Sequence, residues 1–279
     1  MSSSFAYLAA SEKDRKALAS LEQAIAGAAS DLPAPQMTSL SERWGCRDRC
    51  LLSYLRNSDV NFSTDKAVKR LKASLTFWND TGLDREADIQ GQMERHPLHT
   101  VWPMSFPLTT PCGCPVQFCR VAAVKPSQLT KSPAGEEGLR TYLSLWLARA
   151  LELQAAIQRT RHCKGTYDVY DCQGASWAQM DLGALRTIGK LMAVGEAHFP
   201  DNLYKCFVIN APSWASFVWG TIKPFLGEST KRKISISTSV PPALTEALGG
   251  EAALKTMIDS VPSTLPVQPP SVPAVIDVE

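Results

Sequence analysis

Side chains that could carry out catalysis are present in this chain, but their spacing does not group them into an active site. The sequence contains four histidines, at positions His96, His99, His162 and His198. His96 and His99 could both reach a metal ion, yet a metal site needs about three or four ligands. Asp168 and Asp171 are separated by three in an expected strand, so they point to opposite faces and cannot act as paired carboxylates. Nucleophile-elbow, zinc-protease and phosphate-loop motifs do not occur, so we predict that the protein is not an enzyme.

The eight cysteines are expected to be free thiols. The N-terminus has neither a basic segment nor an apolar stretch long enough for a signal peptide, which favours a reducing compartment. Cys112 and Cys114 flank a glycine in a turn, and Cys46 and Cys50 lie four apart on an expected helix. Zinc binding is the alternative, but no second ligand pair completes either set. We therefore expect no metal site and small, buried cysteine side chains.

Composition excludes several classes of protein. With 279 residues, of which 44% are hydrophobic, the chain can build a sizeable core. A formal net charge of +2 gives no support for a nucleic-acid-binding protein. No apolar run approaches the roughly 18 residues that a membrane-spanning helix needs. Any contact with a membrane should therefore be peripheral.

The segment from His198 to Thr238 is the most informative part of the sequence. Residues 204–210 form a short apolar run that ends in Asn-Ala-Pro, which is typical of a buried strand. Because side chains alternate along a strand, Phe207 and Ile209 are expected to pack under helices. The opposite face is then free to line a cavity and carries Cys206, Val208 and Asn210.

An apolar helix is expected over residues 214–226, followed by a basic turn at 231–233 and a strand that opens at Ile234. Such a helix suits a lid over a hydrophobic cavity. The predicted lid residues share one helical face and are Trp214, Phe217, Val218, Ile222, Phe225 and Leu226. Membrane contact is expected through an aromatic side chain and nearby cations, namely Trp219, Lys223, Lys231 and Arg232.

Strands and helices alternate through the rest of the chain. The expected strands cover 115–124 and 166–171, and residues 82–110 show extended and turn signals with little periodicity. The expected helices cover residues 11–28, 39–56, 64–79, 136–161, 180–198 and 241–259, with a linker at 31–36. This alternation predicts an α/β fold with a mostly parallel sheet under helical cover.

The motifs of the 198–238 segment resemble those of the CRAL-TRIO lipid-binding family, which includes fungal phosphatidylinositol/phosphatidylcholine transfer proteins. The matching residues are Pro200-Asp201, Val208-Ile209-Asn210-Ala211-Pro212, Lys223-Pro224-Phe225-Leu226 and Lys233-Ile234. Residues 50–56 and 66–68 are similar to the family's N-terminal helical unit. The resemblance implies a hydrophobic cavity enclosed by the sheet and its helices. It also implies an N-terminal helical unit over 1–90, a lipid-binding domain over 91–260 and a Pro-rich tail over 261–279 that we expect to be disordered.

The same resemblance implies where a lipid headgroup would lie. Thr166 keeps a hydroxyl that the family's phosphatidylinositol binders use, whereas Asp168 replaces the second hydroxyl with a carboxyl. Asp201 keeps an acid and Lys233 keeps the lysine. If phosphatidylinositol is the ligand, Asp168 should turn away from it or pair with a basic residue. The tyrosines that hold choline in relatives fall on Phe106, Gln117 and Ser144, which predicts no choline cage.

Three functional hypotheses remain open at this point. The first is a cytoplasmic, peripherally membrane-associated protein that extracts a phospholipid, phosphatidylinositol foremost, into a cavity gated by the 214–226 helix. The second is a carrier of a single-chain or isoprenoid hydrophobe, like the tocopherol and retinal carriers of this fold. The third is a non-enzymatic adaptor for small GTPases or membranes. In each case we expect no cofactor other than a bound lipid, a transient membrane partner, no nucleic acid and a monomeric chain.

Overall fold

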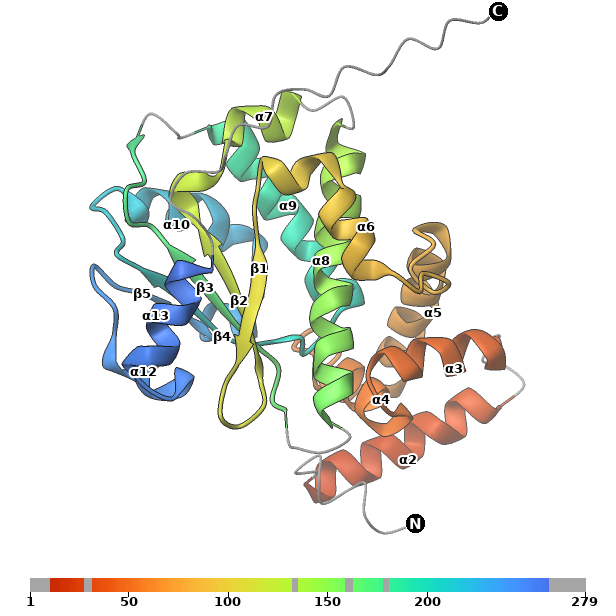
Figure 1. The fold of residues 1–279 in the computed structure, drawn as a ribbon. Coiled ribbons are helices and arrows are strands. Elements are labelled where there is room, and N and C mark those ends of the chain that lie inside the picture. The colour runs from red at the N-terminus through yellow and green to blue at the C-terminus, as the bar shows by residue number, and fades with distance from the viewer. Residues whose placement is uncertain (1–10, 28–31, 132–134, 159–162, 178–180, 261–279) are drawn as a thin grey trace, which may run out of the picture.

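A computed structural model of the chain describes residues 11–27, 32–131, 135–158, 163–177 and 181–260. Helices at the N-terminal end form a bundle beside an α/β unit (Figure 1). The expected tail, 261–279, lies outside the described residues. Among the described residues, no helix is both long and apolar enough to cross a bilayer.

The N-terminal bundle contains α2 (Glu12–Ala26), α3 (Ala34–Arg43), α4 (Arg47–Arg56) and α5 (Thr64–Asp80). Ser11 and Asp14 cap α2 reciprocally, since the Ser11 side chain accepts from the Asp14 N–H and the Asp14 carboxylate accepts from Ser11. The single helix expected over 39–56 is wrong, because the chain turns at Trp44 and Gly45. Gly45 has φ +83°, a left-handed conformation that glycine adopts without steric cost and that ends α3.

The sheet has five strands in the order in which they follow in the chain: β1 (Ser105–Thr109), β2 (Pro115–Arg120), β3 (Thr166–Asp171), β4 (Leu203–Ile209) and β5 (Ile234–Ile236). Only the β1–β2 pair is antiparallel, and the other three pairs are parallel. The predicted α/β class with a mostly parallel sheet is therefore confirmed. The expected strand 115–124 ends early, because residues 121–123 form a 3₁₀ turn.

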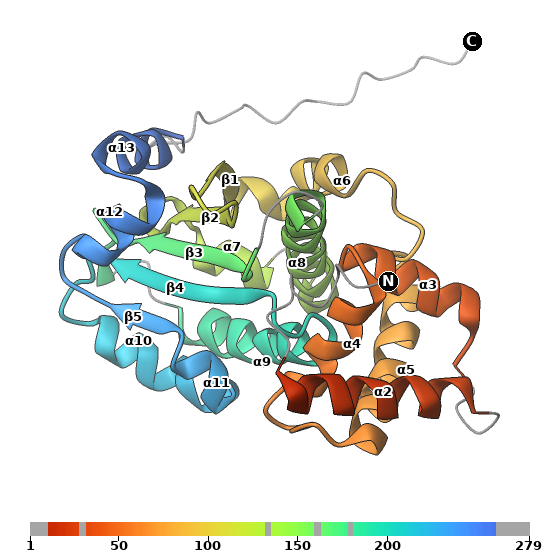
Figure 2. The same ribbon diagram turned by 90° about the horizontal axis from the view of Figure 1, so that it is seen from below.

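Helices cover both faces of the sheet (Figure 2). One face carries α8 (Gly135–Gln158) and α9 (Leu182–His198), with α6 (Ile89–Arg95) and α7 (Pro126–Lys131) beside them. The opposite face carries α12 (Pro242–Leu248) and α13 (Glu251–Asp259), divided at a left-handed Gly249. The helix α6 and a 3₁₀ turn at Pro97–Thr100 correct the expectation of an irregular 82–110 segment.

The expected 214–226 helix is divided in two. It consists of α10 (Ala215–Ile222) and a 3₁₀ turn at Lys223–Phe225. Pro224 explains the change, because proline has no N–H to donate to the carbonyl one turn earlier. A short helix, α11 (Glu228–Lys231), follows in place of the expected irregular turn and leads into β5.

The two faces of the sheet differ in polarity, as the two-residue period of a strand allows. Val116, Phe118, Val169, Phe207 and Ile209 join a dry core with α12 and α13. The alternate positions on the opposite face, toward α8 and α9, carry polar side chains in the central strands, including Gln117 and Asp168. The second face is therefore the one that can hold a ligand.

The core does not divide at residue 90, where the sequence places a domain boundary. Trp78 of α5 packs on Phe199, with ring centroids 5.1 Å apart, and Phe77 stacks on His198 at 4.2 Å. Burial, together with the nearby Arg140 and Arg70, lowers the pKa of His198 to about 4. One hydrophobic cluster thus includes residues of α2–α5 together with residues of α8 and α9. The boundary at residue 90 stays a prediction.

Candidate functional site

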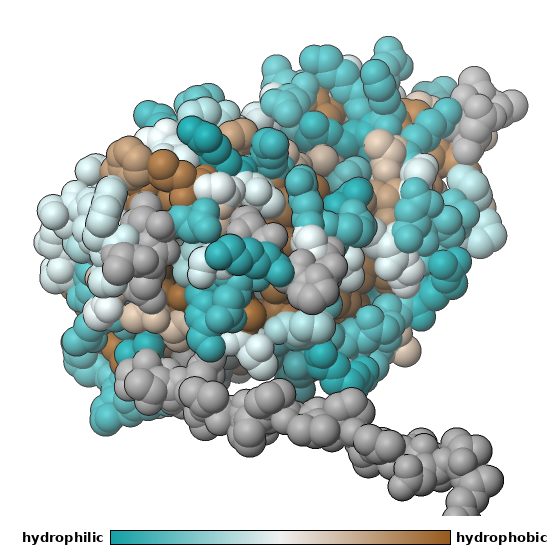
Figure 3. Space-filling view, turned by 90° about the horizontal axis from the view of Figure 1, so that it is seen from above, coloured by the Kyte–Doolittle hydropathy of each residue, from teal (hydrophilic) through white to brown (hydrophobic). Residues whose placement is uncertain are grey.

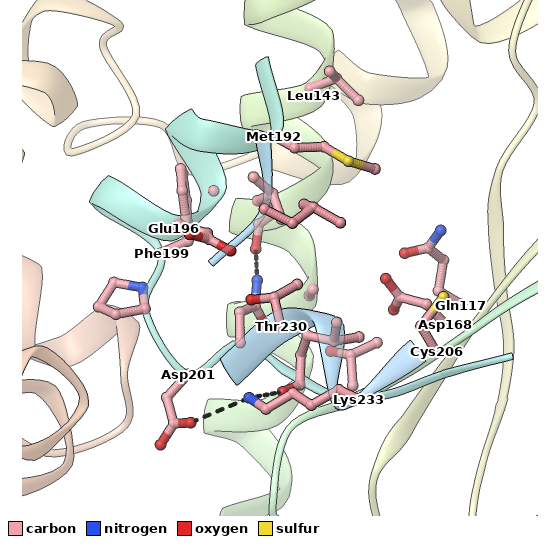
Figure 4. Close-up of a pocket in the computed structure, with 18 of the residues that line it drawn as sticks. Gln117, Leu143, Asp168, Met192, Glu196, Phe199, Asp201, Cys206, Thr230 and Lys233 are labelled. Carbon is pink, nitrogen blue, oxygen red and sulfur yellow. Dashed lines mark hydrogen bonds and ion pairs between the residues drawn. The ribbon is translucent and has the colours of Figure 1, made fainter. Parts of the chain in front are cut away.

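A cavity of about 210 Å³ lies between the polar face of the sheet and helices α8 and α9. Its apolar wall comes from one side of each helix, with Leu143, Leu147, Ile188, Leu191 and Met192. Polar and charged side chains line the part near β5 and the end of α4, among them Asp201, Thr230 and Lys233 (Figure 4). The cavity is therefore amphipathic.

Strand register places four cavity residues in one row across the sheet. Gln117 is level with Asp168, and Asp168 is level with Cys206. Cys206 is in turn level with Ile234 on the edge strand β5. Since neighbouring strands lie about 4.8 Å apart, this row runs from the second strand of the sheet to its edge.

Lys233 and Asp201 form the charged end of the cavity, at this edge. The Lys233 ammonium donates to the Leu203 carbonyl at 2.6 Å and lies 3.6 Å from a carboxylate oxygen of Asp201 (Figure 4). Asp201 follows the end of α9 in a left-handed conformation, with φ +59°. Both side chains are partly exposed, so a ligand could exchange with this ion pair at low cost.

Thr166 lines the cavity but is already part of an internal network. Its hydroxyl accepts a hydrogen bond from the Gln154 side chain at 2.7 Å, and the same amide nitrogen donates to the Asn202 carbonyl at 3.1 Å. The amide oxygen of Gln154 accepts from the buried Arg49. Thr166 still has its own hydroxyl proton to donate.

The Asp168 carboxyl faces the cavity on the central strand β3 (Figure 4). No residue in the described part of the chain gives it a hydrogen bond or an ion pair. The sequence analysis expected Asp168 to turn away from a phosphatidylinositol headgroup or to pair with a basic residue. In the structure it does neither. The side chain is only half-buried because it opens on the cavity, yet it is removed from bulk water. This desolvation raises the pKa of Asp168 to about 8, so the carboxyl is mostly protonated at neutral pH.

The predicted cavity and lid residues fall into two groups. Cys206 and Leu226 line the cavity. The other seven lie outside the lining: Val208, Asn210, Trp214, Phe217, Val218, Ile222 and Phe225. The reason is that α10 and the following turn pack against α9 rather than over the cavity. Phe225 lies directly on Gly189 of α9, where an added methyl group would come within 2.6 Å of a ring carbon.

Asn210 has a structural contact instead of a place in the cavity. Its side-chain amide donates to the Asp171 carboxylate at 2.8 Å and so joins the carboxyl ends of β3 and β4. Its own backbone is left-handed, with φ +53°, a conformation that asparagine adopts more readily than most residues.

The outer surface of α10 is aromatic. Phe217 is 47% exposed and Trp177 is 55% exposed, and their rings lie 5.7 Å apart. Trp214 also lies beside Trp177, at 6.1 Å. Viewed from above, hydrophobic side chains reach the surface in several places between polar ones (Figure 3). Aromatic side chains of this kind suit the interface of a bilayer.

The predicted membrane contacts differ in their exposure to solvent. Trp219 is half-buried, whereas Lys223 and Arg232 are exposed. Lys231 is bound to Glu228 at 2.6 Å. The exposed cations among the predicted contacts are therefore Lys223 and Arg232.

The cysteines and the positions of the relatives' choline cage can also be placed. The Cys112 and Cys114 sulfurs lie 3.7 Å apart. Cys46 is half-buried, and Cys50 is fully buried. Within the described ranges, no three His, Cys, Asp or Glu side chains are grouped to hold a metal ion. Of the three cage positions only Gln117 lines the cavity, since Phe106 stacks on Trp146 and Ser144 is buried.

Three cavity features were missed in the sequence. Gln154 lies in the mainly apolar segment Leu151–Ile157, where Glu152 is the one other polar residue, and an amide among apolar neighbours is a detectable sign of a buried contact. Tyr170 shares strand parity with Asp168, so the strand period alone would place it on the cavity face. Glu196, whose carboxylate accepts from the Gly227 N–H at 2.8 Å, had no sequence signal.

The geometry describes an α/β protein with an amphipathic internal cavity. Residues 102–251 match the CRAL/TRIO domain family, so the chain belongs to that family, as the sequence predicts. It is similar to two Arabidopsis thaliana proteins named phosphatidylinositol/phosphatidylcholine transfer proteins. It is 24% identical to SFH9 over 177 residues, which is 63% of this chain and 31% of the relative. It is 28% identical to SFH4 over 127 residues, which is 44% of this chain and 21% of the relative.

The chain spans about a third or less of the length of these two curated relatives. A solved structure titled "Crystal structure of Sfh5" shares the fold, with a TM-score of 0.54 at 14% identity. The alignment with that structure covers 86% of this chain and 88% of the other.

The raised pKa of Asp168 predicts that the delipidated protein loses stability as pH rises. The unfolded chain ionises this carboxyl near pH 4, whereas the folded chain keeps its proton to about pH 8. The folded state therefore binds more protons between these values, and stability falls by up to about 1.4 kcal/mol per pH unit. Asp168→Asn should remove this part of the slope and raise the unfolding temperature at pH 8. Denaturant titrations of both proteins at pH 5 and pH 8 measure the free energy of unfolding. An equal change of this free energy with pH in wild type and in Asp168→Asn would contradict the raised pKa of Asp168.

Proposed function

We propose that the protein binds a lipid in the cavity and transfers it between membranes without enzymatic chemistry. The observation that carries the proposal is the amphipathic cavity, with apolar walls on α8 and α9 and an ion pair at the edge of the sheet. Burial of an acyl chain in such a site is favourable by about 0.8 kcal/mol per methylene. Family membership and the names of the Arabidopsis relatives support the same function.

Phosphatidylinositol is the proposed cargo, with its headgroup at the Lys233 end. Lys233 could meet the phosphate as a point charge, and Asp201 could accept hydrogen bonds from inositol hydroxyls. The two side chains already lie side by side at the open edge. Asp168 adds little repulsion at neutral pH, because its carboxyl is mostly protonated there.

A two-chain lipid requires the cavity to open. Pockets for drug-sized ligands occupy about 300–1,000 Å³, and the cavity of about 210 Å³ is smaller. We propose that the 214–226 segment is the gate. Its visible attachments to α9 include the Phe225 ring on Gly189, with the Gly227 N–H bond to Glu196 directly after it.

The cavity volume favours one alternative, a carrier of a single-chain or isoprenoid hydrophobe, since such a ligand needs less space. The adaptor hypothesis has no such observation in its favour. Cytoplasmic location, peripheral membrane association and a monomeric state stay predictions.

The first test is the cargo. Native mass spectrometry and solvent extraction of the purified chain should show a co-purified lipid. Met192→Trp, which fills the apolar wall, should reduce the lipid content several-fold. Ala193→Trp is the matched control, because Ala193 is the next residue on α9 and is exposed. An empty wild-type chain that also takes no lipid from vesicles would rule out the proposal.

The second test is the headgroup. Lys233→Ala should lower phosphatidylinositol loading by about tenfold or more, the expected effect of losing a hydrogen bond to a charged group. Unfolding should change little, because a partly exposed ion pair contributes about 0–1 kcal/mol. Lys255→Ala is the control, since Lys255 pairs with Asp259 on the exposed surface of α13. Loading equal to wild type after Lys233→Ala would favour the single-chain alternative.

The third test is the docking surface. A basic side chain near an anionic membrane contributes about 1 kcal/mol. Replacing Lys223 and Arg232 with glutamine should therefore weaken binding to phosphatidylserine vesicles by about 2 kcal/mol and flatten its salt dependence. Lys66→Gln with Lys69→Gln on α5 is the control, since both of these lysines are exposed. Vesicle sedimentation at several salt concentrations measures the effect, and an equal loss in both pairs would place the docking surface elsewhere.

A further inference from the structure

One carboxyl group in the cavity lining has no charged partner among the described residues. Lys233 is bound to Asp201 and to the Leu203 carbonyl. Arg56 is bound to Asp14 at 2.9 Å, a contact that lowers the pKa of that carboxyl. Both cations of the lining are thus engaged with carboxylates of the protein. Asp168 also lines this cavity and has no such partner among the described residues.

The groups beside Asp168 on the sheet supply no positive charge. Gln117, level with it on β2, donates its amide to the Tyr170 hydroxyl at 3.2 Å and accepts from the Trp146 indole at 2.9 Å. The titratable groups that face it from β3 and β4 are Tyr170 and Cys206. Burial raises the pKa of both above the ordinary values, so both stay neutral.

The helices opposite the sheet bring no cation to this carboxyl. Where α8 lines the cavity it presents apolar side chains, and α9 adds one titratable group, Glu196, which is itself an acid. Unpartnered polar groups in a protein interior are rare, and each one points to a missing partner. Because this carboxyl opens on the cavity, a polar group of a bound ligand can reach it.

We infer that Asp168 is a second binding position in the cavity, which takes the ammonium group of a single-chain amphiphilic amine. This inference rests on the proposed lipid-binding function and adds a ligand class to it. The position lies on the central strand β3, whereas the Lys233 position lies beside the edge strand β5. The two positions therefore differ in both place and sign of charge.

An ammonium group fits this position better than an alcohol or an anion. It donates charge-assisted hydrogen bonds to both carboxylate oxygens, which are stronger than those of a hydroxyl. Trp102, Trp146 and Tyr170 line the same cavity, and aromatic rings are compatible with a bound cation. The apolar walls take one chain, in keeping with a cavity of about 210 Å³. Above about pH 8, where Asp168 is ionised, a fatty acid would bring a second carboxylate next to it and be repelled.

Binding of the ammonium group should be linked to a proton. The amine keeps its charge below about pH 10, as a lysine side chain does. Asp168 must release its proton when the ammonium group binds. Affinity for the amine should therefore rise with pH between about 6 and 8, by up to tenfold per unit.

The experiment compares three probes of equal chain length: dodecylamine, 1-dodecanol and dodecanoate. Each is titrated into the delipidated full-length chain, and binding is read by calorimetry and by the fluorescence of the cavity tryptophans. At about pH 9, where Asp168 is mostly ionised, wild type should bind the amine about tenfold or more tighter than the alcohol and should reject dodecanoate. Asp168→Asn should abolish both this preference and its pH dependence. Asp168→Glu keeps the carboxylate and should retain the preference, and Asp259→Asn on the surface is the control.

Every outcome of this comparison decides something. An amine preference that survives Asp168→Asn, or an alcohol that binds wild type as tightly as the amine, overturns the inference. If Asp168→Asn does not fold, the pH dependence in wild type and in Asp168→Glu still tests it, and a flat profile in both overturns it. Loading of wild type with phosphatidylinositol from vesicles tests the proposed function separately. A chain that loads phosphatidylinositol but shows no amine preference refutes only the inference.

Discussion

The side chain of Gln154 connects the parts of the protein that surround the cavity. It is fully buried near the end of α8, and its amide accepts from Arg49 of α4 and donates to Thr166 of β3 and to the Asn202 carbonyl before β4. The Asn202 side chain also contacts α8, because its amide donates a hydrogen bond to the Leu147 carbonyl at 3.2 Å. Loss of the amide would leave a buried arginine without one of its acceptors, which costs far more than the average hydrogen bond. The distance between α8 and the sheet therefore depends on this contact, and with it the cavity.

The cavity exists because the two faces of the sheet are filled differently. Toward α12 and α13 the strands present large apolar side chains that leave no space. Toward α8 and α9 the central strands present Gln117, Asp168 and Cys206, which line the cavity instead of packing against large apolar side chains. The polar row across the sheet is thus a cause of the cavity as well as its lining. Placing a carboxyl in this row removes it from water, and this desolvation raises the pKa of Asp168.

Local signals in the sequence were sufficient for the regular elements and insufficient for the breaks between them. The strand Thr166–Asp171 was predicted with both ends correct, because a tyrosine- and valine-rich run stops before a Gly. The turn at Gly45 was missed, since leucines continue the apolar period on both sides and only the left-handed φ separates the two helices. The headgroup positions Thr166, Asp168, Asp201 and Lys233 come from distant parts of the chain, yet they all line one cavity. That prediction came from the resemblance to the CRAL-TRIO motifs, and amino-acid composition alone could not have provided it.

The sequence predicted an apolar face on the 214–226 segment but not the element that covers it. An apolar stripe shows that a helix buries one face, but it does not say against which element. Here α10 and the turn after it bury that stripe on α9, and the Phe225 ring occupies the space that Gly189 leaves free. The segment still meets the cavity at Leu226, and the Gly227 N–H donates to Glu196 directly after it. Opening of the proposed gate would have to release the packing of α10 and the following turn on α9, including the Phe225 ring on Gly189. Trp177 and Phe217 are already exposed, so they are available to a membrane surface before any such release.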